Sequence, residues 1–448
     1  MMRIKFMSWI LAVLLFSCTE RDGYKELLES GDLLVQANEK LTDVIVHDIF
    51  SPPVASRIYA YPAIAAYEVA VLAGDDRYVS LMGQLNGSEP ADFDACEECS
   101  YSLAALAAFY KVATQLVFSE QEMIAHREAT YKKLKDEGMP KTLFQNSIAL
   151  GEIVAEHILK YAGKDNYHQS RSFEKYTIKN DPGTWKPTPP AYMEGIEPHW
   201  NRIRPFALDS ANQYLPALPT PFEIIPESEF FREAKEVMDA GINLTKEQKD
   251  IAYFWDCNPY KMNVKGHVMY AEKKITPGGH WVGIACIASK AAGLDWKATS
   301  ETLAVTSIHL FDGFIACWDE KYRSILIRPE TYINLYLDED WLPLLQTPPF
   351  PEYTSGHSVI STAASHALTR LLGEPFPFLD STEVKYGLAA RSFNSFKEAA
   401  DEAAISRFYG GIHYMPAIEN GVEQGKMVAD HISQRLVTRK DRLTASKE

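Results

Sequence analysis

Two cations in the last third of the chain have a spacing that suits the binding of a small anion. Residues 318–329 read WDEKYRSILIRP and place Lys321 and Arg328 seven residues apart. On a helix, that spacing points both side chains to nearly the same side. Pro329 disfavours helix at the residue before it, so we predict that Arg328 lies at a helix end, where its guanidinium can enter a pocket. Taken alone, the pair is also typical of solvated surface cations.

A second segment offers the amino terminus of a helix as an anion site. Residues 348–373 read PPFPEYTSGHSVISTAASHALTRLLG. Ser355 suits the N-cap, so Gly356 and His357 are predicted to open a helix that runs to Gly373. The first backbone N–H groups of a helix lack intrahelical partners, and a glycine lets an anion approach them closely. His357 is then placed to exchange protons with a bound oxyanion, although an ordinary capped helix with an incidental histidine has the same pattern.

The third segment, SRFYGGIHYMPAIENG at 406–421, contributes one more cation and one more imidazole. Arg407 is predicted to end a helix, and the glycine pair at 410–411 to reverse the chain, so that His413 precedes a helix that begins near Pro416. A glycine-rich turn between helices with a satisfied histidine is the alternative. Taken together, the three segments supply two arginines, a lysine, a serine, a helix amino terminus and two histidines, which is a complete set for binding a tetrahedral or trigonal-bipyramidal oxyanion.

The elements that must position these residues are predicted to be helices, because helical periodicity is common and strand signals are weak. The predicted helices cover residues 30–49, 102–115, 119–136, 141–162, 228–240, 245–256, 280–293, 296–326, 356–372, 395–409 and 416–436. Between 176 and 227, prolines and tryptophans replace the periodicity, and we predict an ordered loop that packs over the helical body. A second stretch of this kind covers residues 346–354.

The composition is that of a globular protein with an acidic surface. The chain has 448 residues, 46% hydrophobic and 23% charged, and a formal net charge of −15. Such a charge disfavours nucleic acid and anionic lipid headgroups as partners, but it does not exclude a local cationic pocket. The chain lacks H-E-x-x-H, G-x-S-x-G, G-x-G-x-x-G and G-x-x-x-x-G-K-[ST], the signatures of zinc peptidases, α/β-hydrolases, dinucleotide-binding folds and P-loop enzymes.

The amino terminus is typical of an exported bacterial lipoprotein. A short basic region precedes an apolar run of about a dozen residues, too short to span a bilayer. The sequence LFSC resembles a lipoprotein signal, with residues 1–17 as the signal peptide and Cys18 as the lipidated residue. We therefore expect a lipid-anchored protein of the bacterial cell envelope, on its periplasmic or surface side.

The remaining cysteines fall into two groups. Cys96 and Cys99 form a C-x-x-C that fits a local disulfide or a pair of free thiols, and not a zinc site. The other cysteines have apolar or aromatic surroundings and are predicted to be small buried side chains; they are Cys257, Cys286 and Cys317.

The three ordered segments resemble a known family. K-x6-RP at 321–329, SGH at 355–357 and SR-x5-H at 406–413 are similar to the signature of the superfamily of type 2 phosphatidic acid phosphatases and vanadium haloperoxidases. Trp318, and the run PPFPEY that contains Phe350, are closer to the soluble haloperoxidases than to the membrane phosphatases. The resemblance implies an all-α fold, a helical bundle with long ordered loops. The proline- and tryptophan-rich stretch also marks a soft boundary, so we expect an N-terminal helical region at 18–227 and a C-terminal catalytic region at 228–448.

The resemblance further implies a role for each site residue. One set would bind the oxyanion and consists of Lys321, Arg328, Ser355, Gly356 and Arg407. His413 would be the covalent or coordinating ligand and His357 the acid–base residue, while Trp318 and Phe350 would form the pocket wall.

Two positions depart from the family pattern. Thr354 replaces a usual proline. Ala417 replaces an aspartate that commonly orients the last histidine, so a different residue must orient His413. Glu419 is a substitute only if the local backbone departs from a regular helix.

Three functions follow from these residues. A vanadium-dependent haloperoxidase would bind vanadate at His413 and oxidise a halide with hydrogen peroxide. An acid phosphatase of the same superfamily would use His413 to attack phosphorus and would need no cofactor. A lipoprotein that binds carbohydrate through its aromatic side chains is a non-enzymatic alternative. The wall of Trp318 and Phe350 and the missing aspartate favour the haloperoxidase, which acts on small molecules.

Overall fold

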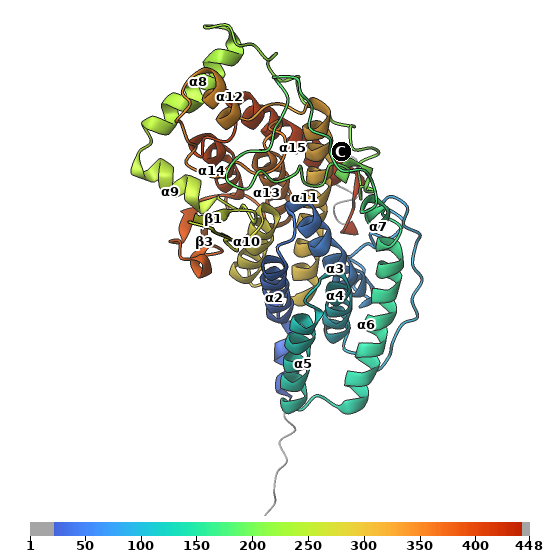
Figure 1. Ribbon diagram of the computed structural model, residues 1–448. Coiled ribbons are helices and arrows are strands. Elements are labelled where there is room, and N and C mark those ends of the chain that lie inside the picture. The colour runs from blue at the N-terminus through green and yellow to red at the C-terminus, as the bar shows by residue number, and fades with distance from the viewer. Residues whose placement is uncertain (1–21, 441–448) are drawn as a thin grey trace, which may run out of the picture.

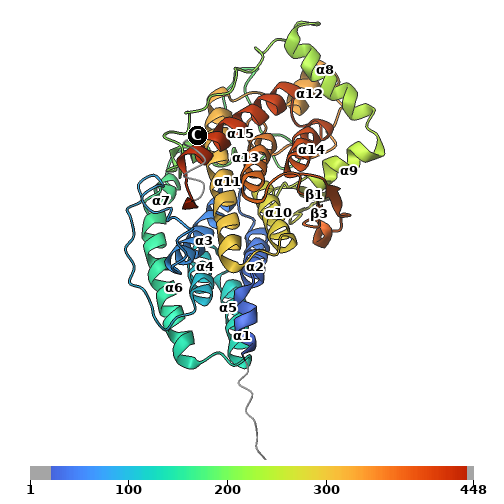
Figure 2. The ribbon, with the colours of Figure 1, turned by 180° about the vertical axis from the view of Figure 1, so that it is seen from behind.

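The computed structural model describes residues 22–440 and places most of them in α-helices (Figures 1 and 2). The predicted all-α fold is therefore confirmed. The predicted signal peptide at 1–17 and the predicted lipidation site Cys18 lie outside the described residues. Within 22–440, no helix has the length and apolar composition that crossing a bilayer requires.

The α-helices in the described part of the chain have the following bounds: α1 Gly23–Glu29, α2 Asp32–Asp48, α3 Pro52–Leu72, α4 Tyr101–Leu116, α5 Glu120–Asp136, α6 Lys141–Ala162, α7 Tyr167–Ser170, α8 Glu229–Ile242, α9 Lys246–Phe254, α10 Pro277–Ala291, α11 Trp296–Ser324, α12 Pro329–Tyr336, α13 Gly356–Leu372, α14 Phe396–Tyr409 and α15 Met415–Arg435. Every predicted helix is present, and its ends lie within three residues of the prediction. Two short 3-10 helices are η1 (Trp200–Arg202) and η2 (Val384–Tyr386).

Helix α3 is the one long helix that the periodicity did not indicate. Its side chains are buried on all sides from Pro52 to Ala70, so it has no polar face to produce an amphipathic pattern. Three prolines also argue against helix in the sequence. Two of them occupy the first turn, where the missing N–H is not needed, and Ser51 caps that turn by accepting a hydrogen bond from the Val54 N–H.

Helix α11 joins the two ends of the molecule. The N-terminal helices α2 and α3 pack against α11, with α4–α6 further out, and the C-terminal helices α13 and α15 pack against its upper part (Figures 1 and 2). One continuous cluster of buried apolar side chains draws on both groups of helices. The predicted catalytic segments lie on the α11, α13 and α15 side of this core.

The strands form two antiparallel hairpins in the described part of the chain. Strand β1 (Met262–Lys265) pairs with β2 (Val268–Ala271), and β3 (Phe378–Asp380) pairs with β4 (Arg391–Phe393). Asp380 lies opposite Arg391 at the end of the second hairpin. Both hairpins lie near α10 and do not alter the all-α class (Figure 1).

The proline- and tryptophan-rich stretch is an ordered loop, as predicted. Trp185 and Trp200 are fully buried, whereas Tyr192 is exposed. The buried carboxylate of Asp312, on α11, accepts hydrogen bonds at 2.7–3.0 Å from the N–H groups of three consecutive loop residues, 206–208. The loop is therefore fastened to the central helix.

The cysteines also have defined states. Cys96 and Cys99 form a disulfide, which resolves the two alternatives left by the sequence. The three predicted small buried thiols are indeed buried and free. Cys257 differs from the other two because it also lines the cavity described below.

Candidate active site

Lys321 and Arg328 do not share a helix, although their spacing suggested it. Helix α11 ends at Ser324, and Ile325 takes a left-handed conformation (φ 44°) that turns the chain away. Arg328 instead occupies the N-cap position of α12, in agreement with its predicted place at a helix end. Both side chains are fully buried, so they are not surface cations.

Lys321 donates its protons to the backbone that leads into α13. Its Nζ lies 3.0 Å from the Pro351 carbonyl, 3.0 Å from that of Glu352 and 2.6 Å from that of Thr354. Burial lowers the pKa of this ammonium to about 7. Lys321 thus holds the 351–354 segment in place and puts a titratable positive charge behind it.

Arg328 contacts the histidine that the sequence singled out as the ligand. Its Nη1 donates to the Ile412 carbonyl (2.8 Å) and lies 3.2 Å from Nε2 of His413. Its Nε donates to the Phe350 carbonyl at 3.0 Å. Burial lowers the pKa of Arg328 to about 10, which leaves it charged at neutral pH.

Glu352 is the residue that orients His413, and sequence reasoning missed it. Its Oε1 lies 2.8 Å from His413 Nδ1 and accepts the Tyr414 N–H at 3.0 Å. Burial and then the charge of Arg328 hold the pKa of His413 well below its ordinary value, so the imidazole is neutral. Because Arg328 donates to Nε2, the proton of His413 lies on Nδ1 and points at Glu352.

Neither Ala417 nor Glu419 orients His413. Ala417 is buried, and its carbonyl accepts the Ser355 N–H at 2.9 Å. Glu419 lies exposed on the regular helix α15 and is not near the imidazole. The available signal for Glu352 was an acidic residue within the otherwise apolar run PPFPEY. Burial raises the pKa of Glu352 to about 7.

The amino terminus of α13 has the predicted form. Ser355 is the N-cap, and its Oγ accepts the Ser358 N–H at 3.3 Å. Gly356 opens the helix, and a Cβ at this position would make only ordinary contact with Trp318. His357 lies in the first turn. Burial and then the charge of Arg407 hold the pKa of His357 well below its usual range, so it is a neutral base.

Arg407 lies in the last turn of α14 and is anchored at one end. Its Nη1 donates to the Trp255 carbonyl at 2.8 Å, and burial lowers its pKa. The guanidinium is thereby held against the segment that follows α9, with its Nε unengaged.

A narrow cavity brings part of this set together. Gly356, His357, Arg407 and His413 line it, and the wall includes Trp318 and Phe350, whose ring centroids are 5.0 Å apart. Further lining residues are Pro52, Cys257, Asn258, Pro259, Tyr260, Pro277, Phe314 and Pro348. The other predicted residues, Lys321, Arg328 and Ser355, are buried close by without lining it.

The donors around this cavity fit an oxyanion. Arg328 Nη2, Arg407 Nε and His357 Nε2 are buried and have no hydrogen-bond partner among residues 22–440. Buried polar groups are almost always satisfied, so these three atoms indicate a bound ligand, and the two guanidinium N–H groups among them require one that accepts hydrogen bonds. The two guanidinium groups give the site a positive charge. The lone pair on Nε2 of the neutral His413 accepts from Arg328, and it becomes available to a ligand that takes over this Arg328 N–H. Vanadate therefore fits this donor set.

The chain is similar to known haloperoxidases over nearly its full length. Residues 334–440 match the family described as "VCPO second helical-bundle domain". A bacterial vanadium-dependent iodoperoxidase of solved structure is 50% identical, with a TM-score of 0.86 over 91% of this chain and 97% of that one. The comparison with curated protein sequences gave no match.

Two more distant structures share the fold. A holo-type bacterial vanadium-dependent chloroperoxidase is 17% identical, with a TM-score of 0.64 over 87% of this chain and 93% of that one. An apo-type structure, also of a bacterial vanadium-dependent chloroperoxidase, is 16% identical, with a TM-score of 0.60 over 86% and 95%.

Fold and site together define an enzyme that holds an oxyanion inside a helical bundle, as in the superfamily of type 2 phosphatidic acid phosphatases and vanadium haloperoxidases. Within it, the chain belongs to the vanadium-dependent haloperoxidase family. Its substrates are accordingly small molecules.

Proposed function

We propose that this enzyme binds vanadate and oxidises iodide with hydrogen peroxide. The observation that carries the proposal is the set of three unpartnered buried polar atoms beside the neutral His413, namely two guanidinium donors and the Nε2 of His357. The choice of iodide is supported by the 50% identity to a protein described as a vanadium-dependent iodoperoxidase. The overall reaction consumes hydrogen peroxide, iodide and one proton and yields hypoiodous acid and water.

Each residue of the site would make a different contact with vanadate. His413 would ligate it through Nε2, because Glu352 holds the proton on Nδ1. Arg328 and Arg407 would neutralise its oxygens through their unengaged N–H groups, and Gly356 would offer its backbone N–H. When bound, vanadate supplies a Lewis-acidic centre that activates hydrogen peroxide toward the halide.

His357 is the group that would move protons. Its Nε2 is buried and unengaged, and its low pKa keeps it unprotonated at neutral pH. It can therefore accept a proton from hydrogen peroxide as that molecule enters the cavity and return one to the leaving water. Trp318 and Phe350 cover this region with apolar surface, which limits the access of bulk water.

A halide panel with and without vanadate tests the proposal. We expect the purified protein to oxidise iodide with hydrogen peroxide only after addition of vanadate, and His413→Ala to lose this activity. If bromide is oxidised but iodide is not, the assignment of the halide is wrong. If the protein hydrolyses a phosphomonoester and vanadate inhibits that reaction, the chain is a phosphatase and the whole proposal fails.

We also propose that the enzyme is anchored to the cell envelope through Cys18. The supports are the basic and apolar segments before this residue and the disulfide at Cys96–Cys99, which suits an oxidising compartment. Labelling with a radioactive fatty acid should mark the chain in a bacterial host, and Cys18→Ala should remove the label. A wild-type chain that stays unlabelled contradicts the proposal.

A further inference from the structure

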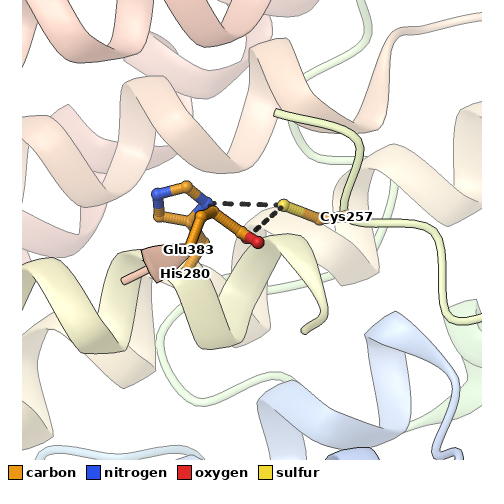
Figure 3. A group of neighbouring side chains, drawn as sticks. All are labelled: Cys257, His280 and Glu383. Carbon is orange, nitrogen blue, oxygen red and sulfur yellow. Dashed lines mark hydrogen bonds and ion pairs between the residues drawn. The ribbon is translucent and has the colours of Figure 1, made fainter. Parts of the chain in front are cut away.

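Three potential metal ligands meet in the core beside the cavity (Figure 3). Cys257 follows α9, His280 lies in the first turn of α10, and Glu383 lies between β3 and η2. All three are buried. Cys257 Sγ is 3.4 Å from His280 Nδ1 and 3.8 Å from Glu383 Oε1, and His280 Nδ1 is 3.4 Å from the same carboxylate oxygen.

These separations match the edges of a tetrahedral site. Zinc binds sulfur at about 2.3 Å and nitrogen or oxygen at about 2.0–2.2 Å, so two ligands at the tetrahedral angle lie about 3.4–3.6 Å apart. The three observed edges depart from these values by about 0.2 Å or less. A metal ion could therefore be accommodated with only a small adjustment of the side chains.

The second nitrogen of His280 is also held as in a metal site. Its Nε2 lies 2.7 Å from Asp380 Oδ2. The other oxygen of Asp380 accepts the N–H and the hydroxyl of Thr382, at 3.0 and 2.7 Å. A carboxylate on the outer nitrogen of an imidazole is the usual support of a metal-binding histidine, and it leaves Nδ1 as the nitrogen that faces the ligand.

The cluster contains more acidic groups than basic ones. Two buried carboxyl groups, Asp380 and Glu383, and one thiol face a single imidazole. The nearby Lys274 forms its ion pair with Asp256, at 2.7 Å, and not with Asp380 or Glu383. A divalent ion that displaces the thiol proton would balance this group of acids.

From this geometry we propose that Cys257, His280 and Glu383 bind a zinc-class divalent ion. One sulfur, one nitrogen and one oxygen donor suit Zn²⁺ and exclude the all-oxygen sites of calcium or magnesium. Cys257 lines the cavity, which gives the ion a route of entry.

The ion would fix one side of the active site. The ring of His280 stacks on that of Trp255, with centroids 4.4 Å apart, and the Trp255 carbonyl anchors Arg407. Cys257 continues the same segment. Binding of the ion would tie this segment to α10 and thereby hold the guanidinium in place, so its role is positioning and not catalysis.

Metal titration of the vanadate-free full-length protein tests the proposal. After chelator treatment, we expect one equivalent of Co²⁺ to bind and to give a thiolate-to-cobalt charge-transfer band, and Zn²⁺ to displace it. At 100 times its Kd, zinc should lower the unfolding equilibrium constant about 100-fold. Because this readout needs neither vanadate nor halide, its failure is distinct from failure of the proposed function.

Paired variants assign the ligands. Cys257→Ser should abolish the charge-transfer band and Glu383→Gln should weaken binding, whereas Cys286→Ser, which alters another buried thiol on α10, should leave both unchanged. Asp380→Asn should reduce the affinity 10–100-fold without changing the stoichiometry. The proposal is overturned if the wild-type protein binds no Co²⁺, or if Cys257→Ser retains the band. In either case the cluster is a hydrogen-bonded group only.

Discussion

Replacement of Arg407 by alanine separates the binding of vanadate from the stability of the fold. The side chain is held by one hydrogen bond to the Trp255 carbonyl, and its Nε is unengaged beside the cavity. The variant removes one of the two guanidinium charges of the site. It leaves the histidines and the amino terminus of α13 in place.

The expected loss follows from the charge. A cation about 4 Å from a unit negative charge contributes about 4 kcal/mol at an effective dielectric constant of about 20. Arg407→Ala should therefore weaken vanadate binding about 1,000-fold. Arg407→Lys keeps the charge but loses the fork of N–H groups, so its affinity should lie between those of the wild type and Arg407→Ala.

The fold should tolerate the change. The Trp255 carbonyl loses its partner, which costs about 1–3 kcal/mol. Part of this is offset because a buried charge is removed, the same burial that lowers the pKa of Arg407. We expect unfolding to remain cooperative, with a free energy of unfolding reduced by no more than about 2 kcal/mol.

Calorimetric titration with vanadate and thermal unfolding measure the two quantities. Arg127→Ala is the matched control, because Arg127 lies on α5, does not line the cavity, and contacts the neighbouring Glu128 and the Tyr131 ring. The reasoning is refuted if Arg407→Ala binds vanadate within tenfold of the wild type. Equal weakness of the lysine and alanine variants would show that charge is not the decisive contribution.

Three further predictions concern single side chains. Glu352→Gln keeps the shape but not the charge of the side chain that orients His413, so it should weaken vanadate binding about tenfold in the same titration. The control Glu419→Gln alters an exposed residue and should leave vanadate binding unchanged. Glu68 is buried, and burial raises its pKa in the folded state to about 7, from 4.5 in the unfolded chain. Between pH 4.5 and pH 7 the folded state therefore keeps a proton on Glu68 that the unfolded chain releases, and the free energy of unfolding falls as the pH rises. Urea unfolding should show that Glu68→Gln removes a decline of about 3 kcal/mol across this window, and an unchanged decline would contradict the assignment. Gly425→Ala would place a Cβ 2.3 Å from the Val359 carbonyl of α13 and should lower the free energy of unfolding by about 1–3 kcal/mol. Gly163→Ala, at the end of α6, should change the free energy of unfolding little. Equal effects of the two substitutions would contradict the packing argument.

The sequence predicted helices well wherever a helix has one polar and one apolar face. Helix α6 is the clearest case, since its predicted bounds and observed bounds coincide at Lys141 and Ala162. Helix α3 escaped detection because its burial on all sides removes the polar face and because its three prolines, one of them inside the helix at Pro62, argue against helix in the sequence. Periodicity reports partial burial, so the most deeply buried helix is the one that it cannot reveal.

For the site, the sequence identified the residue types but not their geometry. The spacing of Lys321 and Arg328 suggested one helix face, but the left-handed Ile325 breaks the helix between them. Whether a donor is already satisfied depends on contacts between distant segments, such as those of Lys321 with carbonyls thirty residues further on. Glu352 was missed for the same reason: its contact with His413 spans 61 residues and leaves no local pattern.

The three hydrogen bonds of Lys321 have a consequence for ligand entry. An ammonium group has three protons, and the carbonyls of Pro351, Glu352 and Thr354 already take all of them. An oxyanion that recruits one of these protons must release part of the backbone leading into α13. Occupancy of the site and order of that backbone are then thermodynamically linked, and each must affect the other by the same factor. Hydrogen exchange at the amides of residues 350–358 would therefore respond to a ligand that never touches most of them.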